Sequence, residues 1–187
     1  MKKRILNVGC GDETYGTHFV DLYPSRKEVI KCNVDEEKLP FPNNYFDIVY
    51  SRNLLEHLKN PWFALKEMKR VLKKGGRLIL ITDNASYYLF HLSKSYSAHY
   101  HNYIERGKED KHYMLFTTKH LENFIELLSL KLIKICLLTQ YNPERKNPII
   151  KFPEWKSKLA LLNRLLGKIP FISHIAFPRI LVIAKKI

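Results

Sequence analysis

Residues 3–22 read KRILNVGCGDETYGTHFVDL, and this stretch decides the fold. The apolar run over 3–8 ends at Gly9, which is typical of a buried parallel strand followed by a tight turn. Residues 18–22 then predict a second strand. A glycine-rich turn between two such strands lies at the carboxyl edge of a sheet, where open α/β folds bind ligands.

The rest of the chain continues to alternate strands with helices. Asn60 and Pro61 predict the start of one helix, and Thr118 is expected to cap another. Apolar runs predict further strands over 29–34, 46–50, 77–82, 131–139 and 180–184. This alternation favours a mostly parallel sheet with helical crossovers.

The connections between the first three strands are unusually short. Residues 12–17 and 23–28 are all that link them, whereas a parallel crossover normally takes a dozen or more residues. We therefore expect the early crossover helices to be reduced, and another element to cover the apolar face that they would leave bare. The candidates are the segment 140–177, which we favour, and a second copy of the chain; monomer and homodimer both stay open.

At 187 residues the chain predicts one domain, 1–187, with insertions at 84–116 and 140–177. No apolar run approaches the roughly 20 residues that span a bilayer, and no secretory signal is evident, so a cytoplasmic location is expected. The three cysteines have no metal-ligand spacing and are interpreted as reduced, mostly buried residues. The formal charge of +14 is spread along the whole chain and indicates either anionic partners or a lysine-rich composition.

Acidic side chains follow the strands beside the glycine turn. Asp21 ends the second predicted strand and Asp35 the third, so a glycine turn and two carboxylates share one edge of the sheet. Carboxylates in this order can accept from a ribose diol and an adenine amine, which predicts an adenosine pocket. A nicotinamide-dinucleotide site is disfavoured, because Thr14 stands where its third glycine belongs.

Four motifs carry a family resemblance: LNVGCG at 6–11, VDEEKLPFPNNYFDIV at 34–49, LEHL at 55–58 and VLKKGG at 71–76. In order and spacing they resemble class I S-adenosylmethionine-dependent methyltransferases of the type 11 family. The resemblance implies a Rossmann-like three-layer α/β sandwich with a mostly parallel seven-stranded sheet and an antiparallel strand near the C-terminus. It also implies a methyltransferase that uses S-adenosyl-L-methionine.

The family pattern places the methionine end of the cofactor at the glycine turn and beside Ser51, the ribose at Asp21 and the adenine at Asp35. The cofactor-binding residues expected on this basis are Asn7, Gly9, Gly11, Asp21, Leu22, Asp35 and Ser51. Two residues depart from the pattern: Asn7 replaces an acid, and Glu13 replaces the third glycine of the motif.

Glu56 and His57 follow the fourth strand and would face the cofactor site in the family geometry. His57 is the candidate general base, with an unperturbed imidazole pKa of about 6.5, and Glu56 its acidic neighbour. The alternative is that both residues cap and pack the following loop. No metal is expected, because the acid that precedes such a pair in metal-binding relatives is Asn53 here.

The acceptor-binding residues are expected in the insertion 84–116, which would cover the acceptor pocket. The candidates are His99, Tyr100 and His101; ordinary aromatic packing in a surface loop is the alternative. The residues after the fourth strand lack the motif of amino-methylating nucleic-acid enzymes. We therefore favour O- or N-methylation of a small molecule, such as an anionic sugar or a lipid-linked intermediate. An RNA methyltransferase and an inactive cofactor-binding partner subunit are the competing interpretations.

The segment 155–168 predicts a basic amphipathic helix. Its apolar face carries Trp155, Leu159, Leu162 and Leu166, with lysine and arginine outside that face. This pattern is typical of a helix on a membrane surface and equally of a helix packed on its own domain. We favour packing on the domain, with Trp155, Leu159 and Leu162 as buried anchors; peripheral membrane contact is the alternative.

Overall fold

The structure is a computed structural model of the chain. It describes residues 3–88, 103–105, 108–110, 112–138, 165–166, 168–169 and 172–187.

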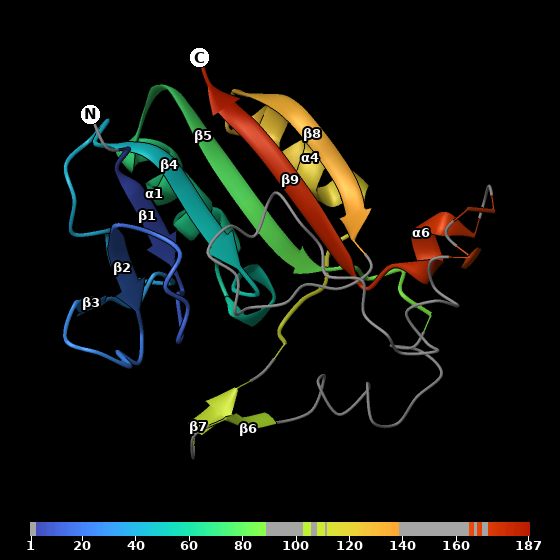
Figure 1. Cartoon of the computed structure of the whole chain (residues 1–187), viewed down its shortest axis with the longest axis horizontal. Helices are drawn as coiled ribbons and strands as arrows, with labels where there is room; N and C mark the ends of the chain where they lie inside the picture. The colour runs from blue at the N-terminus through green and yellow to red at the C-terminus, as the bar shows by residue number, and fades with distance from the viewer. Residues whose placement is uncertain are drawn as a thin grey trace.

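Seven strands form one sheet in the order β3-β2-β1-β4-β5-β9-β8. Neighbouring strands from β3 to β5 are parallel, and β9 is antiparallel to both β5 and β8 (Figure 1). The strands are β1 Ile5–Val8, β2 His18–Asp21, β3 Val29–Lys31, β4 Phe46–Arg52, β5 Leu72–Asp83, β8 Leu130–Leu138 and β9 Arg179–Lys186. The predicted fold class is confirmed: a Rossmann-like, mostly parallel α/β sheet with an antiparallel strand near the C-terminus.

Two helices, α1 Pro61–Val71 and α4 Thr118–Leu127, lie together on one face of the sheet (Figure 1). Asn60 caps α1 as expected, accepting from the amide of Phe63. The cap of α4 is Thr117 rather than Thr118, because Thr117 has extended backbone and accepts from the amide of His120. Four short elements complete the described structure: η1 Leu55–His57, β6 Tyr103–Glu105, β7 Lys108–Asp110 and α6 Ser173–Ala176.

The main core lies between this face of the sheet and the two helices. Its fully buried side chains come from the sheet and from both helices, and include Leu6, Val49, Leu65, Met68, Leu121 and Val182. Burial of such large apolar side chains stabilises the fold by roughly 1.5–3 kcal/mol each. Among the described helices, none is both long and apolar enough to cross a membrane.

The opposite face carries a second buried cluster with no helix from the early crossovers. Tyr50, Ile79 and Leu181 are almost completely buried there. Residues 9–17 and 22–28 are described throughout and contain no helix, which confirms that the early crossover helices are reduced. The anchors predicted to replace these helices, Trp155, Leu159 and Leu162, lie outside the described residues.

The cysteines confirm the expected burial at two of three positions. Cys10 and Cys32 are buried, and Cys136 is partly buried. Burial raises the pKa of the Cys10 thiol to about 12 and of the Cys32 thiol to about 11. Thiols protonated to that extent are poor nucleophiles at neutral pH.

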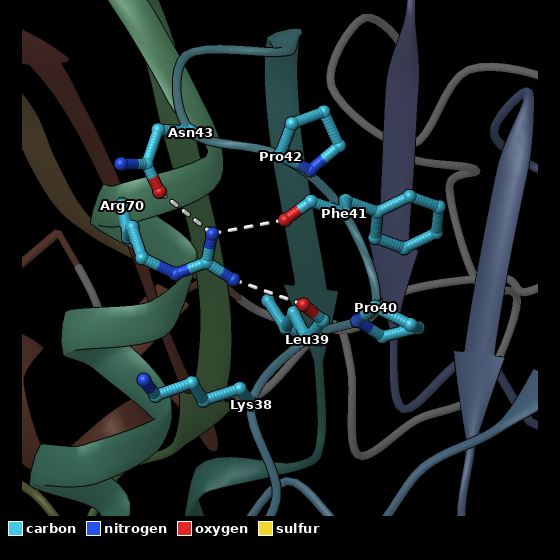
Figure 2. A pocket seen from close by; sticks show the side chains of 7 residues that line it. All are labelled: Lys38, Leu39, Pro40, Phe41, Pro42, Asn43 and Arg70. Atoms are coloured by element: carbon cyan, nitrogen blue, oxygen red, sulfur yellow. Dashed lines mark hydrogen bonds between the residues drawn. The ribbon is translucent and has the colours of Figure 1, made fainter.

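The LPFP segment is held against α1 by Arg70 and by Glu67, whose carboxylate accepts from the Leu39 amide at 3.0 Å. Figure 2 shows Arg70 reaching from α1 toward loop 38–43, where its guanidinium donates to the carbonyls of Leu39 and Phe41 and to Asn43 Oδ1. A pocket lined by loop 38–43 and Arg70 opens here. Because this loop leads into the first residue of β4, the pocket lies at the amino end of the strand, about 20 Å from its carboxyl end.

Candidate functional site at the carboxyl edge of the sheet

The turn after β1 is built on two glycines with left-handed backbone. Gly9 has φ +67°, and a Cβ placed there would lie 2.7 Å from Leu54 Cδ1, so a larger residue does not fit without movement. Gly11 has φ +51°, and apart from Gly11 and its two chain neighbours no atom of the described residues lies within 4 Å of a Cβ built on it. The turn is therefore tightly packed at Gly9 and open above Gly11, a cradle that a ligand could approach closely.

Asp21 joins the end of β2 to this turn. One carboxylate oxygen accepts from the Gly11 amide and the other from the Tyr23 amide, each at 2.8 Å. Each oxygen can accept a further hydrogen bond, because a carboxylate offers about four lone-pair sites. The structure thus brings the predicted residues Gly9, Gly11 and Asp21 together, with the neighbouring Leu22 partly exposed.

Asn7 and Ser51 lie near the carboxyl edge of the sheet. Asn7 is in β1, and Ser51 is in the neighbouring strand β4. Ser51 is buried within β4, and its hydroxyl donates to the Val8 carbonyl at 3.0 Å. Asn7 is fully buried, and its amide nitrogen donates to the Tyr15 carbonyl at 3.0 Å. Its Oδ1 atom is buried and has no hydrogen-bond partner among the described residues.

Asp35 is placed differently from Asp21. Its carboxylate accepts from the amides of Lys59 and Asn60, at 3.2 and 2.9 Å, and so ties the segment after β3 to the start of α1. Asp35 lies at the carboxyl side of the sheet, as expected. About half of the lone-pair sites of its carboxylate accept from backbone amides.

Glu56 is a completely buried acid beside the end of β5. One oxygen accepts from the Thr82 hydroxyl at 2.7 Å, and the other is buried with no hydrogen-bond partner in the part of the chain that the structure describes. Burial raises the pKa of Glu56 to about 7, with a further increase from the negative charge of Asp83; His57 and the Thr82 hydroxyl act in the opposite direction. The site therefore holds a carboxyl group that exchanges its proton near neutral pH.

A second titratable cluster extends from this acid. The rings of His57 and His112 meet edge to face with centroids 4.4 Å apart. His112 Nδ1 lies 3.9 Å from Asp83 Oδ2, and Arg179 Nε lies 3.4 Å from Asp83 Oδ1. The end of β5, the start of β9 and the segment before α4 thus converge on Glu56 and His57. Strand-end position, the criterion that singled out Asp21 and Asp35, would also have found Asp83.

The three predicted acceptor-binding residues, His99, Tyr100 and His101, lie outside the described residues. Within the described part of the chain, no group of three or more metal-ligating side chains has the arrangement of a metal site.

Known proteins resemble the segment that contributes most of this edge of the sheet. The family model described as "Methyltransferase domain", type 11, matches residues 18–80. The match covers about a third of the chain and shows that this segment is similar to the methyltransferase domain of that family. The matched segment runs from the first residue of β2 into β5 and includes Asp21, Asp35, Glu56 and His57.

Two curated methyltransferases resemble the chain in sequence. An uncharacterized methyltransferase of Schizosaccharomyces pombe is 36% identical over 39% of this chain and 37% of its own length. The ubiquinone/menaquinone biosynthesis C-methyltransferase UbiE of Burkholderia vietnamiensis is 51% identical over 25% of this chain and 19% of its own length. The alignments therefore span well under half of either relative.

The similarity to solved structures covers almost the whole of this chain. A SAM-dependent methyltransferase from Archaeoglobus fulgidus has a TM-score of 0.61 and 19% identity, over 98% of this chain and 86% of that one. A geranyl diphosphate C-methyltransferase from Streptomyces coelicolor, solved with S-adenosyl-L-homocysteine, has a TM-score of 0.58 and 12% identity, over 100% and 73%. At these identities the likeness shows a common fold.

One feature of this edge of the sheet is not predicted by the sequence. Arg52, the last residue of β4, forms an ion pair with Glu13 in the turn region, with Arg52 Nε 2.5 Å from Glu13 Oε1. Glu13 was noted only as a departure from the glycine motif. The signal available was a charge of opposite sign at another strand end, but the pairing depends on β1 and β4 being neighbours in the sheet.

Proposed function

We propose that the protein is a cytoplasmic S-adenosylmethionine-dependent methyltransferase that acts on an oxygen or nitrogen nucleophile of a small molecule. The observation that carries the proposal is the Gly11–Asp21 hydrogen bond at the carboxyl edge of the sheet. This hydrogen bond joins the open glycine turn to a carboxylate that can accept further hydrogen bonds. The family resemblance predicts that the turn and Asp21 both bind the cofactor.

The residues at this edge fit the cofactor in three respects. The space above Gly11 admits a ligand against the backbone, and Asp21 can accept from the hydroxyls of a ribose. The buried Oδ1 of Asn7 has no hydrogen-bond partner within the described residues and can accept from a bound ligand. Asp35 is proposed for the adenine amine and Ser51 for the methionine side, as in the family pattern.

S-adenosylmethionine, when bound, supplies a methyl group already activated on a sulfonium sulfur. The protein's own task is to hold the acceptor in line and to take a proton from it. His57 is the proposed proton acceptor. The charge of His57 lowers the pKa of the neighbouring Glu56, and the His57 ring packs edge to face against the ring of His112.

We propose a small anionic acceptor. Arg179 lies beside Asp83 at this edge, and the chain as a whole carries a formal charge of +14, which attracts anions to the site. Transfer from the bound methyl donor to a panel of sugar phosphates and lipid-linked precursors would test this class. Transfer to RNA alone, with a steep salt dependence of binding, would replace it.

Calorimetric titration with S-adenosylmethionine and S-adenosylhomocysteine tests the cofactor assignment. The wild-type protein should bind both, and Asp21→Ala should weaken binding by about 1.5–3 kcal/mol, the range for hydrogen bonds to a charged group. Asp47→Ala is the matched control, because Asp47 pairs with Lys73 near the amino end of β4. Absence of binding to the wild-type protein would overturn the proposal; unchanged affinity in Asp21→Ala would remove Asp21 from the site.

A further inference from the structure

Three cations lie side by side across neighbouring strands, near the amino edge of the parallel strands. Arg77 in β5 pairs with Lys185 in β9, and Lys185 pairs with Lys131 in β8. Residues paired in this way project from the same face of a sheet, and adjacent strands lie about 4.8 Å apart. All three residues are exposed. Like charges directly opposite each other destabilise a sheet, so this row lowers the stability of the fold.

Further cations surround the row. Lys134 is exposed in β8, just after the irregularity in its pairing with β9. Lys186 follows Lys185 in β9 and projects from the other face; burial lowers the pKa of its amine, and three neighbouring charges lower it further, those of Lys69, Arg70 and Lys74. Positive charge is therefore concentrated on both faces at this edge. The exposed members on the face opposite the helices form the basic patch: Arg77, Lys131, Lys134 and Lys185.

Acidic side chains do not pair with the basic patch. Asp47 and Glu67, at the same end of the molecule, form ion pairs with Lys73 and Arg70. Within the described ranges, no carboxylate forms an ion pair with a member of the patch. Lysines on an edge strand hinder pairing with other chains, which accounts for those in β8. Arg77 needs another explanation, because β5 is a central strand.

Exposed aliphatic side chains lie beside the basic patch. Leu127, at the end of α4, is 68% exposed, and Ile133 in β8 is 51% exposed. The helix α4 packs against β8, and Figure 1 shows the start of β8 beside the end of β9. Glu126 adds one negative charge next to Leu127 in the chain, against the four positive charges of the patch. This end of the molecule therefore combines unpaired cations with exposed aliphatic groups.

That combination distinguishes two classes of anionic partner. Single-stranded nucleic acids are held by cations together with aromatic side chains on which the bases stack. Tyr23 and Tyr113, the exposed tyrosines of the described residues, lie instead at the carboxyl side of the sheet, beside Asp21 and Glu56. Anionic bilayers are bound by lysine and arginine together with apolar side chains that enter the headgroup region. The composition of this surface favours the bilayer.

We propose that the basic patch, with Leu127 and Ile133, docks the protein on the surface of an anionic lipid bilayer. The four cations face the headgroup phosphates, and the two aliphatic side chains enter the interface between headgroups and acyl chains. The nine residues of β8 lead from this surface toward the carboxyl edge, over about 27 Å. Docking therefore leaves the proposed cofactor site uncovered. The inference goes beyond the proposed function and does not depend on it.

Co-sedimentation with vesicles tests the docking surface. The wild-type protein should bind vesicles of phosphatidylcholine and phosphatidylglycerol, should not bind phosphatidylcholine alone, and should bind less as salt is added. Lys134→Glu/Lys185→Glu should weaken binding by about tenfold or more. This variant should stay folded, because an acid at 185 lies between Arg77 and Lys131; its melting temperature checks this. Leu127→Ser/Ile133→Ser should lower the binding that persists at high salt.

A matched control changes the same charge elsewhere. Lys119→Glu alters a side chain that is 74% exposed at the start of α4, the end remote from Leu127, and should bind vesicles as the wild-type protein does. Wild-type binding to both kinds of vesicle alike, or to neither, would overturn the proposal. Undiminished binding of Lys134→Glu/Lys185→Glu would assign the contact to another surface and overturn it too. Binding to RNA but not to vesicles, lost in the same variant, would replace the bilayer with nucleic acid.

Discussion

Replacing Glu56 with glutamine should change how the stability of the protein depends on pH. Glu56 is fully buried, its carboxylate accepts from the Thr82 hydroxyl, and Asp83 adds negative charge nearby. These surroundings raise the pKa of Glu56 from 4.5 to about 7 in the folded protein. Glutamine keeps the shape and the acceptor for Thr82 but carries no titratable proton.

The sign follows from the direction of the shift. Between about pH 4.5 and 7 the folded protein holds the Glu56 proton and the unfolded chain releases it, so stability falls as the pH rises through this window. A difference of about 2.5 between the folded and unfolded pKa values corresponds to about 3 kcal/mol of unfolding free energy. The stability that Glu56 contributes at pH 4.5 is therefore lost by about pH 7.5.

Urea denaturation at closely spaced pH values measures this loss. The wild-type protein should lose about 3 kcal/mol more than Glu56→Gln between pH 4.5 and 7.5. Glu122→Gln, which changes a charge on the outer side of α4, should follow the wild-type curve. Identical pH dependence in Glu56→Gln and the wild-type protein would refute the idea that Glu56 is held protonated by its surroundings.

Three further substitutions test individual contacts. Gly9→Ala should lower the unfolding free energy in urea by about 1–3 kcal/mol more than Gly11→Ala, because both positions have positive φ but only Gly9 meets Leu54; equal losses would contradict the packing argument. Arg70→Ala should destabilise the protein by about 1–3 kcal/mol and speed amide exchange in the loop that it braces, and slow exchange there would count against that role. Asn84→Asp should be worse than Asn84→Ala, because the Asn84 amide donates to two carbonyls that would repel a carboxylate; the reverse order of melting temperatures would disprove this.

The strands could be predicted because each is a short apolar run that ends at a turn residue. One strand boundary was predicted wrongly: β5 begins at Leu72, directly after α1, and not at Arg77. The reduced early crossovers could also be predicted, because the number of residues between two strands limits the length of any helix that connects them. The cover of the second face could not be derived in the same way, because an apolar segment in the sequence does not specify which surface it packs against.

The site was predictable where one strand end at a time carries the signal, as with Asp21 and Asp35. It was not predictable where residues distant in the chain meet. Glu13 and Arg52 face each other because β4 lies beside β1 in the sheet, although β2 and β3 separate the two strands in the sequence. His112 reaches Asp83 by an equally long-range route. The pKa of Glu56 depends on burial from several elements, and no local pattern of residues encodes it.

A structure of the protein crystallised with S-adenosylhomocysteine would test the central claim most directly. The account predicts the methionine end of the ligand at the Gly9–Gly11 turn and beside Ser51, the ribose hydroxyls on Asp21, and the adenine amine near Asp35. The sulfur should point toward Glu56 and His57, where the acceptor is proposed to bind. Ligand bound away from the carboxyl edge of the sheet, or no ligand at saturating concentration, would contradict it.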